Sequence, residues 1–539
     1  MAFNLPVQNY FTRATGPSDW VRPADWPVIT DVATEVQFLM SDLGDSNVSI
    51  ITAFTRTSGS QNIIIDWGDS TTTTVTTTAS TTSTHNYTPG SGTPCSLGYT
   101  TFKIRVYFSG AGTSTFSACR INAVYIASNT FSNQNCAVLE AYYGDSTLTT
   151  NTSAPSFYSA IGSSSSYSTF NNLTYVKLPA TVTWTTTMAN MFQNCGELVK
   201  VVMPTSASSL TSLSLTFSAC YSLLDITIPS NATAITTMVS AFTNCYNLRS
   251  VSLPTTLNSC TTFQSSFQSC YALRNFTFPS INTATTFINT FTSCFSLEWI
   301  KFTSMPTVAT AINMSTFVNG STNLQTVYFP ATGNASSTYS FNAAFQTCYS
   351  LKTIVFPSNI NVSDFSSAFN SCYSLSSVVM PTSCPSLTSL LSTFSGCTSL
   401  LKITLPTATI ASGINFTSTF QSCYKLQEIT IQAGTIFTSM QSTFASCPSL
   451  KTLNWTPGVQ NSLITMVSTF SGCILLSSIT LPSSMNALTS LSSTFNNCKS
   501  LTSITFPSTL NLVTSIEPSS CLRYFDTIGN WSFVQASNI

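Results

Sequence analysis

Apolar residues return along this chain with a period of about 25 residues. In twelve of thirteen units a cysteine follows a phenylalanine by three residues, whereas Gly320 stands at that position in the remaining unit. A fixed period in this range is typical of one structural unit that is copied and stacked. The sequence therefore predicts a repeat solenoid, marked by these phenylalanines: Phe192, Phe217, Phe242, Phe267, Phe291, Phe317, Phe345, Phe369, Phe394, Phe420, Phe444, Phe470 and Phe495.

Within one unit the apolar spacing changes from helical to strand-like. Phe495, Cys498 and Leu501 fall three residues apart, which predicts a short helical or 3₁₀ turn that faces a core. Ile504 and Phe506 then alternate with a polar residue, which is strand periodicity, and the proline that follows ends the strand. Each coil is thus expected to hold one short parallel strand, a turn at proline, a Ser/Thr-rich return and a short helical turn.

This recurring run, Phe-x-x-Cys-x-x-Leu-x-x-Ile-x-Phe/Leu-Pro, resembles the BspA-type, or Treponema pallidum-type, leucine-rich repeat over about residues 165–510. Segments such as Leu210-Thr-Ser-Leu213 replace the Ile-Gly that the family carries before its Ala-Phe pair, so we expect a differently shaped return. The resemblance implies a binding solenoid, often on bacterial surfaces, with no catalytic residues.

A different pattern precedes the repeats. The turn Asp66-Trp67-Gly68-Asp69, the pair His85-Asn-Tyr87 and an alternating strand over 102–108 follow one another. This order resembles a PKD-type β-sandwich in which Trp67 packs inside. We expect the two aspartates to hydrogen-bond within their turn rather than bind calcium, and His85 to fill a structural position beside Tyr87.

These patterns divide the chain into five expected segments. The arm at the N-terminus, which contains Trp20, Trp26 and the prolines Pro17, Pro23 and Pro27, either docks on another protein or is a frayed terminus. The segments are 1–30, the arm and docking segment; 31–112, the PKD-like sandwich; 113–166, a connecting region with a degenerate starting coil; 167–510, a solenoid of about 13 to 14 coils; and 511–539, a C-terminal cap.

Charge is scarce in this sequence. Only 6% of residues are charged and the net charge is zero, against roughly 25% charged in an average soluble protein. Clustered Lys and Arg for nucleic-acid binding are missing from the pattern, and no apolar run is long enough to predict a membrane span. The N-terminus lacks signal-peptide character. So little charge repulsion favours a protein that works inside a larger assembly.

Of the eighteen cysteines, the twelve of the ladder are predicted to be packed, reduced thiols rather than disulfides, because equivalent residues of successive coils stack and buried cysteine behaves as a small hydrophobe. The pattern offers no metal-binding spacing and no cofactor motif, and His85 is the single histidine. Representative ladder residues are Phe217, Cys220, Phe242, Cys245, Phe267 and Cys270. Six cysteines lie off the ladder, without a predicted pairing: Cys95, Cys119, Cys136, Cys260, Cys384 and Cys521.

Two candidate binding surfaces follow from stacking the coils. The first is an aromatic stripe at the position after the cysteine, which either binds a ligand through the ring faces or stacks on itself. It comprises Tyr221, Tyr246, Tyr271, Phe295, Tyr349, Tyr373 and Tyr424.

The second surface is the strand side of the coils. Thirteen of the fourteen charged residues between Phe192 and Pro507 fall one to seven residues after the cysteine position, and charges of both signs argue against a ligand of one sign. In leucine-rich-repeat solenoids this side is the concave binding face. The candidate contacts are Lys200, Asp225, Arg249, Arg274, Lys301, Tyr328, Lys402 and Glu428.

An enzyme is not expected. A Ser-His-Asp set cannot be built, because the single histidine lies far upstream in a different domain, and no phosphate-binding loop occurs in the sequence. We expect a recognition or adhesion protein, in the first place a phage virion fibre or decoration subunit that binds a host surface, a glycan or a neighbouring virion subunit. A bacterial cell-surface or extracellular adhesin is the second expectation. A purely architectural shell or filament subunit is the third.

Overall fold

The computed structural model describes residues 22–30, 32–41, 48–58, 61–76, 81–88, 91–96, 99–110, 115–126, 138–144, 150–151, 173–180, 183–184, 187–308, 310–408, 413–455, 458–505, 524–525 and 531–532. These residues form strands, bridges and turns, and none of them forms a helix. The chain divides into a first unit, residues 1–260 with 269–273, and a second unit, residues 261–268 with 274–539.

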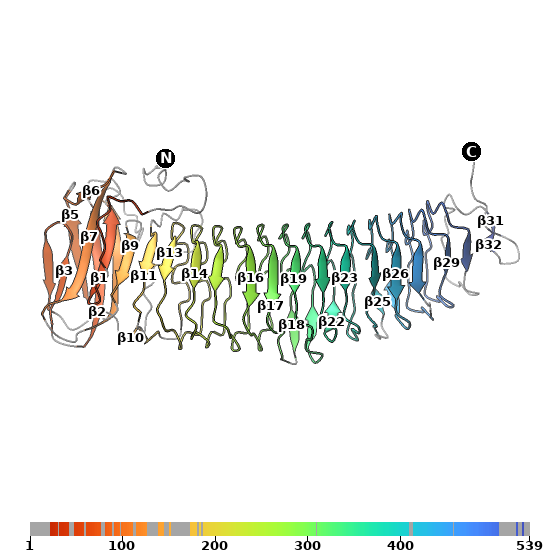
Figure 1. Cartoon of the computed structure of the whole chain (residues 1–539), viewed down its shortest axis with the longest axis horizontal. Helices are drawn as coiled ribbons and strands as arrows, with labels where there is room; N and C mark the ends of the chain where they lie inside the picture. The colour runs from red at the N-terminus through yellow and green to blue at the C-terminus, as the bar shows by residue number, and fades with distance from the viewer. Residues whose placement is uncertain are drawn as a thin grey trace. The chain divides into compact units, whose positions relative to one another are not determined.

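The first unit contains an N-terminal β-region and the first coils of a parallel solenoid (Figure 1). Its strands are β1 (Glu35–Ser41), β2 (Val48–Ser58), β3 (Ile63–Asp66), β4 (Thr72–Val75), β5 (Thr81–Tyr87), β6 (Thr93–Pro94), β7 (Thr100–Phe108), β8 (Thr115–Ile126), β9 (Val138–Tyr143), β10 (Thr150–Asn151), β11 (Tyr175–Lys177), β12 (Thr183–Trp184), β13 (Lys200–Val202), β14 (Asp225–Thr227) and β15 (Ser250–Ser252).

One sheet runs without interruption from the N-terminal region into the coils, in the order β13-β11-β9-β1-β7-β3-β4. β1 pairs antiparallel with β7 and β9, whereas β9 pairs parallel with β11, and β11 with β13. β9 lies in the segment where we expect a degenerate starting coil. β9 is the first strand of the array. Because β1 pairs with the edge of β9 that faces away from β11, this strand offers no open edge to another chain.

A second sheet, in the order β5-β2-β8, packs on the first. The Tyr87 ring of β5 lies 3.9 Å, centroid to centroid, from the Phe102 ring of β7, and the Tyr87 hydroxyl donates to the Trp67 carbonyl at 2.8 Å. Trp67 is fully buried. The N-terminal region is therefore a two-layered β-structure, as the sequence predicts, while its PKD-type identity stays a prediction.

The second unit is built from parallel strands of successive coils and ends in a short antiparallel pair. Its strands are β16 (Asn275–Phe278), β17 (Trp299–Phe302), β18 (Ala311–Asn313), β19 (Thr326–Tyr328), β20 (Thr338–Ser340), β21 (Thr353–Val355), β22 (Asn361–Asp364), β23 (Ser377–Val379), β24 (Lys402–Thr404), β25 (Ile414–Asn415), β26 (Glu428–Ile431), β27 (Phe437–Ser439), β28 (Thr452–Trp455), β29 (Ser478–Thr480), β30 (Ser503–Thr505), β31 (Tyr524–Phe525) and β32 (Trp531–Ser532).

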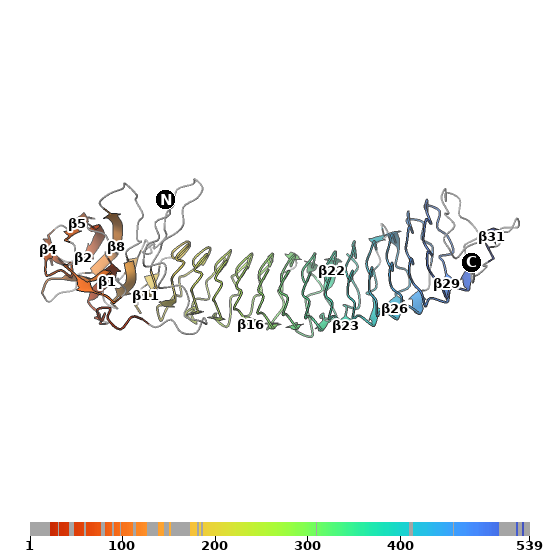
Figure 2. The same ribbon diagram turned by 90° about the horizontal axis from the view of Figure 1, so that it is seen from above.

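Each coil has two strand-forming sides. On one side β16, β17, β19, β21 and β23 form a five-stranded parallel sheet, and β24, β26 and β28 form a three-stranded one. On the opposite side β18, β20 and β22 pair, and isolated bridges such as Thr465 with Ser490 continue the pattern. Figure 2 shows β22 across the coil from β23. The return segments thus form a second, thinner line of parallel bridges, and the predicted solenoid of parallel strands is confirmed.

The expected short helical turn is wrong. Cys372 N donates to Phe369 O at 3.0 Å, as in a tight turn, but Ser371 and Ser367 have φ of 63° and 53°. Each Phe-x-x-Cys turn has one left-handed residue two positions before its phenylalanine and another directly before its cysteine, and this is incompatible with a right-handed helix. Ser, Asn or Gly occupies most of these positions, and this preference is the sequence signal for consecutive turns.

The interior is a stack of phenylalanine rings beside a line of thiols. The Phe345 and Phe369 rings lie 5.1 Å apart and 4° from parallel, and Cys372 Sγ donates to the Phe345 carbonyl at 3.0 Å. Burial raises the pKa of the Cys372 thiol. All fifteen cysteines whose side chains are described are buried and form no disulfide, which includes Cys95, Cys260 and Cys384. The prediction of packed, reduced thiols is confirmed for the twelve ladder cysteines; the sequence makes no prediction for Cys95, Cys260 and Cys384, and the side chains of Cys119, Cys136 and Cys521 lie outside the described part.

A second buried ladder consists of hydroxyl groups and was not predicted. The Thr443 hydroxyl lies 2.8 Å from both the Phe416 and Met440 carbonyls, and the residue is fully buried. Equivalent bonds run from Thr419, Thr469 and other residues that precede the ladder phenylalanine. The bonds to Phe416 and its equivalents tie one coil to its predecessor, and all of these bonds give buried carbonyl groups a donor.

The repeat register at Phe317 differs from the expectation by one residue. Ser321, not Gly320, occupies the cysteine position, because its hydroxyl donates to the Phe291 carbonyl at 2.7 Å as the thiols do in other coils. Val318 takes the place of the ladder phenylalanine, since Cys348 Sγ donates to its carbonyl. The Phe317 ring is consequently turned 83° from the Phe291 ring, and the parallel stacking stops there.

Ellman's reagent is expected to find few thiols in the native protein. Fifteen of the eighteen cysteines are buried thiols that form no disulfide, so at most three should react before unfolding and all eighteen in denaturant. Buried thiols with a raised pKa carry little of the reactive thiolate. Rapid native reaction of more than three would show that the thiols do not line the interior.

Thr443→Val is expected to cost about 1 kcal/mol of stability, because it removes a buried hydroxyl donor while keeping the side-chain shape. The matched control is Thr404→Val, which alters an exposed hydroxyl of β24 and should change stability by less than about 0.5 kcal/mol. Urea-unfolding midpoints measure both. Equal midpoints for the two variants would contradict a stabilising hydroxyl ladder.

Candidate functional site

The candidate strand face consists of the outward residues of the strands that follow each cysteine position. In three-residue strands such as Thr353–Val355 and Lys402–Thr404, the middle residue is buried and the outer two are exposed. Parallel pairing in register places the first residues of successive strands in one row and the third residues in another. Every coil therefore presents two outward side chains at repeating positions.

In the first unit this face carries Lys200 in β13, Asp225 in β14 and Arg249 directly before β15. Lys200 and Asp225 are exposed and Arg249 is half-buried. Asp225 lies opposite Ser250, the residue after Arg249, so these two predicted contacts lie on neighbouring coils. Lys200 opens another strand and pairs in register with Tyr175 of β11.

In the second unit the register brings two predicted pairs together. Lys301 of β17 lies opposite Tyr328 of β19, and Lys402 of β24 lies opposite Glu428 of β26. Arg274 precedes β16 and is exposed. The two pairs lie on different strands and thus do not form one compact site.

An apolar row interrupts this polar face. Tyr328, Val355 and Val379 lie opposite one another on β19, β21 and β23, and their side chains are 53%, 56% and 50% exposed. Sequence reasoning found Tyr328 but not the two valines. Their signal is an apolar third residue where most other strands carry a polar one.

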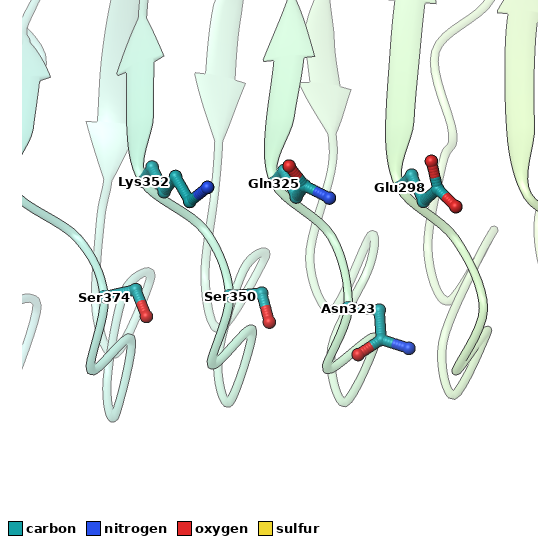
Figure 3. Close-up of a pocket in the computed structure, with 6 residues that line it drawn as sticks. All are labelled: Glu298, Asn323, Gln325, Ser350, Lys352 and Ser374. Carbon is teal, nitrogen blue, oxygen red and sulfur yellow. The ribbon is translucent and has the colours of Figure 1, made fainter.

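The first hollow in the strand face, here the entry hollow, lies where β19 and β21 begin and has a volume of about 360 Å³. All six lining residues are polar: Glu298, Asn323, Gln325, Ser350, Lys352 and Ser374. Figure 3 shows three of them in a row at the strand starts and the other three in the loops below. Amides, hydroxyls and charges of both signs thus surround one open depression.

The second hollow, here the break hollow, has a volume of about 560 Å³ and lies over β23, β24 and β26. It spans the place where the five-stranded sheet ends and the three-stranded sheet begins. Val379, Lys402, Thr404 and Glu428 are among its lining residues. Asn454 Nδ2 donates to Glu428 Oε1 at 2.7 Å, which holds this carboxylate toward β28.

The aromatic stripe stacks on itself. Tyr246 lies 4.9 Å from Tyr221 and 4.7 Å from Tyr271, with ring planes 17° and 1° apart. In the second unit Tyr349 and Tyr373 stack at 5.0 Å, and Phe295 and Tyr424 are exposed. The stacked rings cover one another's faces, so a ligand would meet chiefly ring edges and hydroxyl groups.

His85 belongs to a packed cluster of the N-terminal region. Its ring stacks on Trp67 at 4.7 Å, and Nε2 lies 2.8 Å from Asp69 Oδ2. Burial opposes ionisation of Asp69, but hydrogen bonds from Thr71 and His85 outweigh it, so the pKa of Asp69 lies below its usual value. Asp66 Oδ1 accepts from Gly68 N, whose φ of 79° suits this tight turn. Each group has a structural partner, as the sequence predicts.

A partly buried ion pair between distant segments was not predicted from the sequence. Arg22 donates to both carboxylate oxygens of Glu140 at 2.8 and 3.0 Å, while burial keeps the pKa of Glu140 above its usual value. Nearby, Trp26 is 1% exposed and donates to the Tyr99 hydroxyl. Trp26 therefore packs on its own chain. Residues 1–21 of the expected docking arm, including Trp20, lie outside the described part.

Among the described residues, no group of three or more His, Cys, Asp or Glu side chains is placed to hold a metal ion. Within the same part of the chain, no helix has the length and apolar character needed to cross a membrane.

Comparison with solved structures returns distant likenesses. A leucine rich cell surface protein from Faecalibacterium prausnitzii A2-165 is 23% identical, with a TM-score of 0.30 over 53% of this chain and 80% of that one. The pneumococcal vaccine antigen PcpA is 15% identical, with a TM-score of 0.33 over 64% and 80%. The chain in the TLR13–ssRNA13 complex is 14% identical, with a TM-score of 0.26 over 62% of this chain and 51% of that one. Likenesses this remote carry no inference, and no curated protein matches the sequence.

A family model gives a stronger result. The model described as "BspA type Leucine rich repeat region (6 copies)" matches residues 139–239, 214–343, 341–451, 366–490 and 416–534. These matches overlap and cover most of the chain, including every ladder phenylalanine. The chain belongs to the BspA-type leucine-rich-repeat family.

Proposed function

We propose that this protein is a non-enzymatic recognition or adhesion protein of a bacterial cell surface, and that the strand face makes the contacts. The observation that carries the proposal is the regular outward presentation of two side chains per coil, with hydroxyls, amides and charges over many successive strands. A long surface of this kind suits an extended ligand better than it suits chemistry on a small substrate.

The two hollows support the strand face over the aromatic stripe. Both lie on the strand side of the second unit, and both combine charged groups with hydroxyls. The stripe instead uses its ring faces for stacking between coils. We therefore assign the stripe a stabilising role and the strand face the binding role.

The bacterial surface replaces the virion as our first choice of location. The BspA-type repeat implies a binding solenoid that is often found on bacterial surfaces, and the family match covers most of the chain. Nothing in the match favours a phage fibre or decoration subunit. Buried reduced thiols fit either location, because they stay out of reach of oxidants and other thiols.

The non-enzymatic assignment rests on the chemistry of the face. Glu298 and Lys352 line the entry hollow, and Glu428 and Lys402 line the break hollow, without a histidine or cysteine beside them. The described cysteines are buried and the single histidine packs in the N-terminal region. The lining residues of both hollows therefore offer no Ser–His or Cys–His pair for nucleophilic catalysis.

Antibodies against this protein are expected to label intact cells of the bacterium that produces it, and protease treatment of those cells should remove the label. Purified phage particles from the same culture are the control and should lack the protein. Recovery of the chain in the particles, with unlabelled cells, would favour the virion alternative and contradict our choice.

Glycan and extracellular-protein arrays test recognition itself, with the full chain as the probe. Tyr328→Ser removes an exposed ring from the strand face and should weaken array binding while leaving the melting temperature unchanged. Tyr373→Ser removes a stacked ring of the stripe and should cost about 1 kcal/mol of stability while binding persists. Silence of the unmodified protein on both arrays would contradict a recognition function.

A further inference from the structure

We infer that the strand face of the second unit binds a linear acidic polysaccharide that carries one carboxylate per disaccharide. This inference rests on the proposed recognition function and names its ligand class. It departs from the expectation that charges of both signs on the strand side argue against a ligand of one sign, because that expectation considered the whole array and not the second unit by itself.

The charges of the second unit are unequal between its two sides. Between residues 274 and 505 the strands and the residues directly before them carry five cations and two carboxylates, while two further lysines, Lys425 and Lys499, lie in the turns beside the aromatic stripe. The third carboxylate of this range, Asp364, ends β22 on the opposite side of the coil. A nearly neutral chain thus presents one distinctly positive side.

Three of these cations recur at every second strand. Lys352 directly precedes β21, Lys402 begins β24 and Lys451 directly precedes β28. One strand of the face lies between each successive pair, namely β23 and then β26. Two coils separate successive lysines, which corresponds to about 10 Å for stacked strands; the first of these intervals crosses the break between β23 and β24, and Lys402 lies one residue further along its coil than the other two. Nucleic acid carries charge at a far denser spacing, about 1.7 Å per charge in a duplex, so this pattern fits a sparsely charged polymer.

The three lysines have no protein partner in the described part of the chain. All three side chains are exposed, and none of their amino groups forms an ion pair or hydrogen bond with a described residue. Ammonium groups in this situation keep their hydration until a carboxylate replaces it, and their attraction for that carboxylate weakens with added salt.

The surroundings of the lysines favour sugar rings over an acidic polypeptide. Lys352 stands in the entry hollow and Lys402 in the break hollow, among amides and hydroxyls that match sugar hydroxyl groups. The apolar row of Tyr328, Val355 and Val379 runs over the three strands that reach from one hollow to the other. A pyranose ring has an apolar face and hydroxylated edges, and two linked rings span the distance between successive lysines.

One glutamate in each hollow opposes an anionic ligand and restricts where its carboxylate can sit. Glu428 is already bound by Asn454. Glu298 lies two strands of the face away from Lys352, on the far side of the entry hollow. The glutamates therefore suit the hydroxyl groups of the neutral sugar, while the lysines suit the carboxylate of the acidic one.

Hyaluronan oligosaccharides, with one carboxylate per disaccharide, are the probe for the full-length protein, and carboxyl-reduced hyaluronan of equal length is the neutral control. We expect binding of the acidic form that weakens as salt rises, and at least roughly tenfold weaker binding of the neutral form. The triple variant Lys352→Met/Lys402→Met/Lys451→Met should lose binding to a similar extent. Lys425→Met removes an exposed cation beside the aromatic stripe and should have little effect.

Each other outcome overturns the inference. Equal binding of the reduced polymer would assign recognition to sugar hydroxyls alone, and an unchanged triple variant would place the ligand elsewhere. Polyglutamate binding as tightly as hyaluronan would indicate an acidic polypeptide partner. Lack of hyaluronan binding, together with positive signals on the arrays, would remove this ligand class but leave the recognition function intact. Circular dichroism and melting temperature confirm that each variant is folded.

Discussion

The structure depends on backbone hydrogen bonds that join each coil to the next on several sides at once. The strands pair in parallel, and the turn segments pair as well: Phe394 N donates to Thr419 O, and Phe420 N to Thr443 O, both at 2.8 Å. Because equivalent backbone groups must meet at every step, the coils keep nearly equal lengths. The phenylalanine stack and the thiol and hydroxyl ladders fill the interior that this constraint creates.

The constraint also explains how the chain tolerates irregularity. At Phe317 the backbone positions are kept while the side chains change, so that Val318 and Ser321 occupy places held elsewhere by phenylalanine and cysteine. The serine hydroxyl preserves the hydrogen bond of the thiol. The hydrogen bonds between these two coils are therefore kept, whereas the parallel stacking of the Phe291 and Phe317 rings is lost.

Sequence periodicity predicts the coil, its strand and its buried thiols because these depend on spacing within one repeat. The left-handed turns escaped because Ser367 and Ser371 are compatible with several backbone conformations. The one-residue register shift at Phe317 was not predicted, because this phenylalanine lies directly before Val318, the residue that actually occupies the ladder position. Likewise, the hollows require knowledge of where the sheet breaks, and the Arg22–Glu140 pair joins segments 118 residues apart.

The shared strand β9 has a consequence for assembly of the fold. It pairs with β1 on one edge and with β11 on the other, so the N-terminal region supplies a preformed edge on which the first coil can align. Each completed coil then offers the same edge to the next, and growth needs only neighbours close in sequence. Such a chain can gain or lose whole coils during evolution, lengthening or shortening its reach without redesign of the part that starts it.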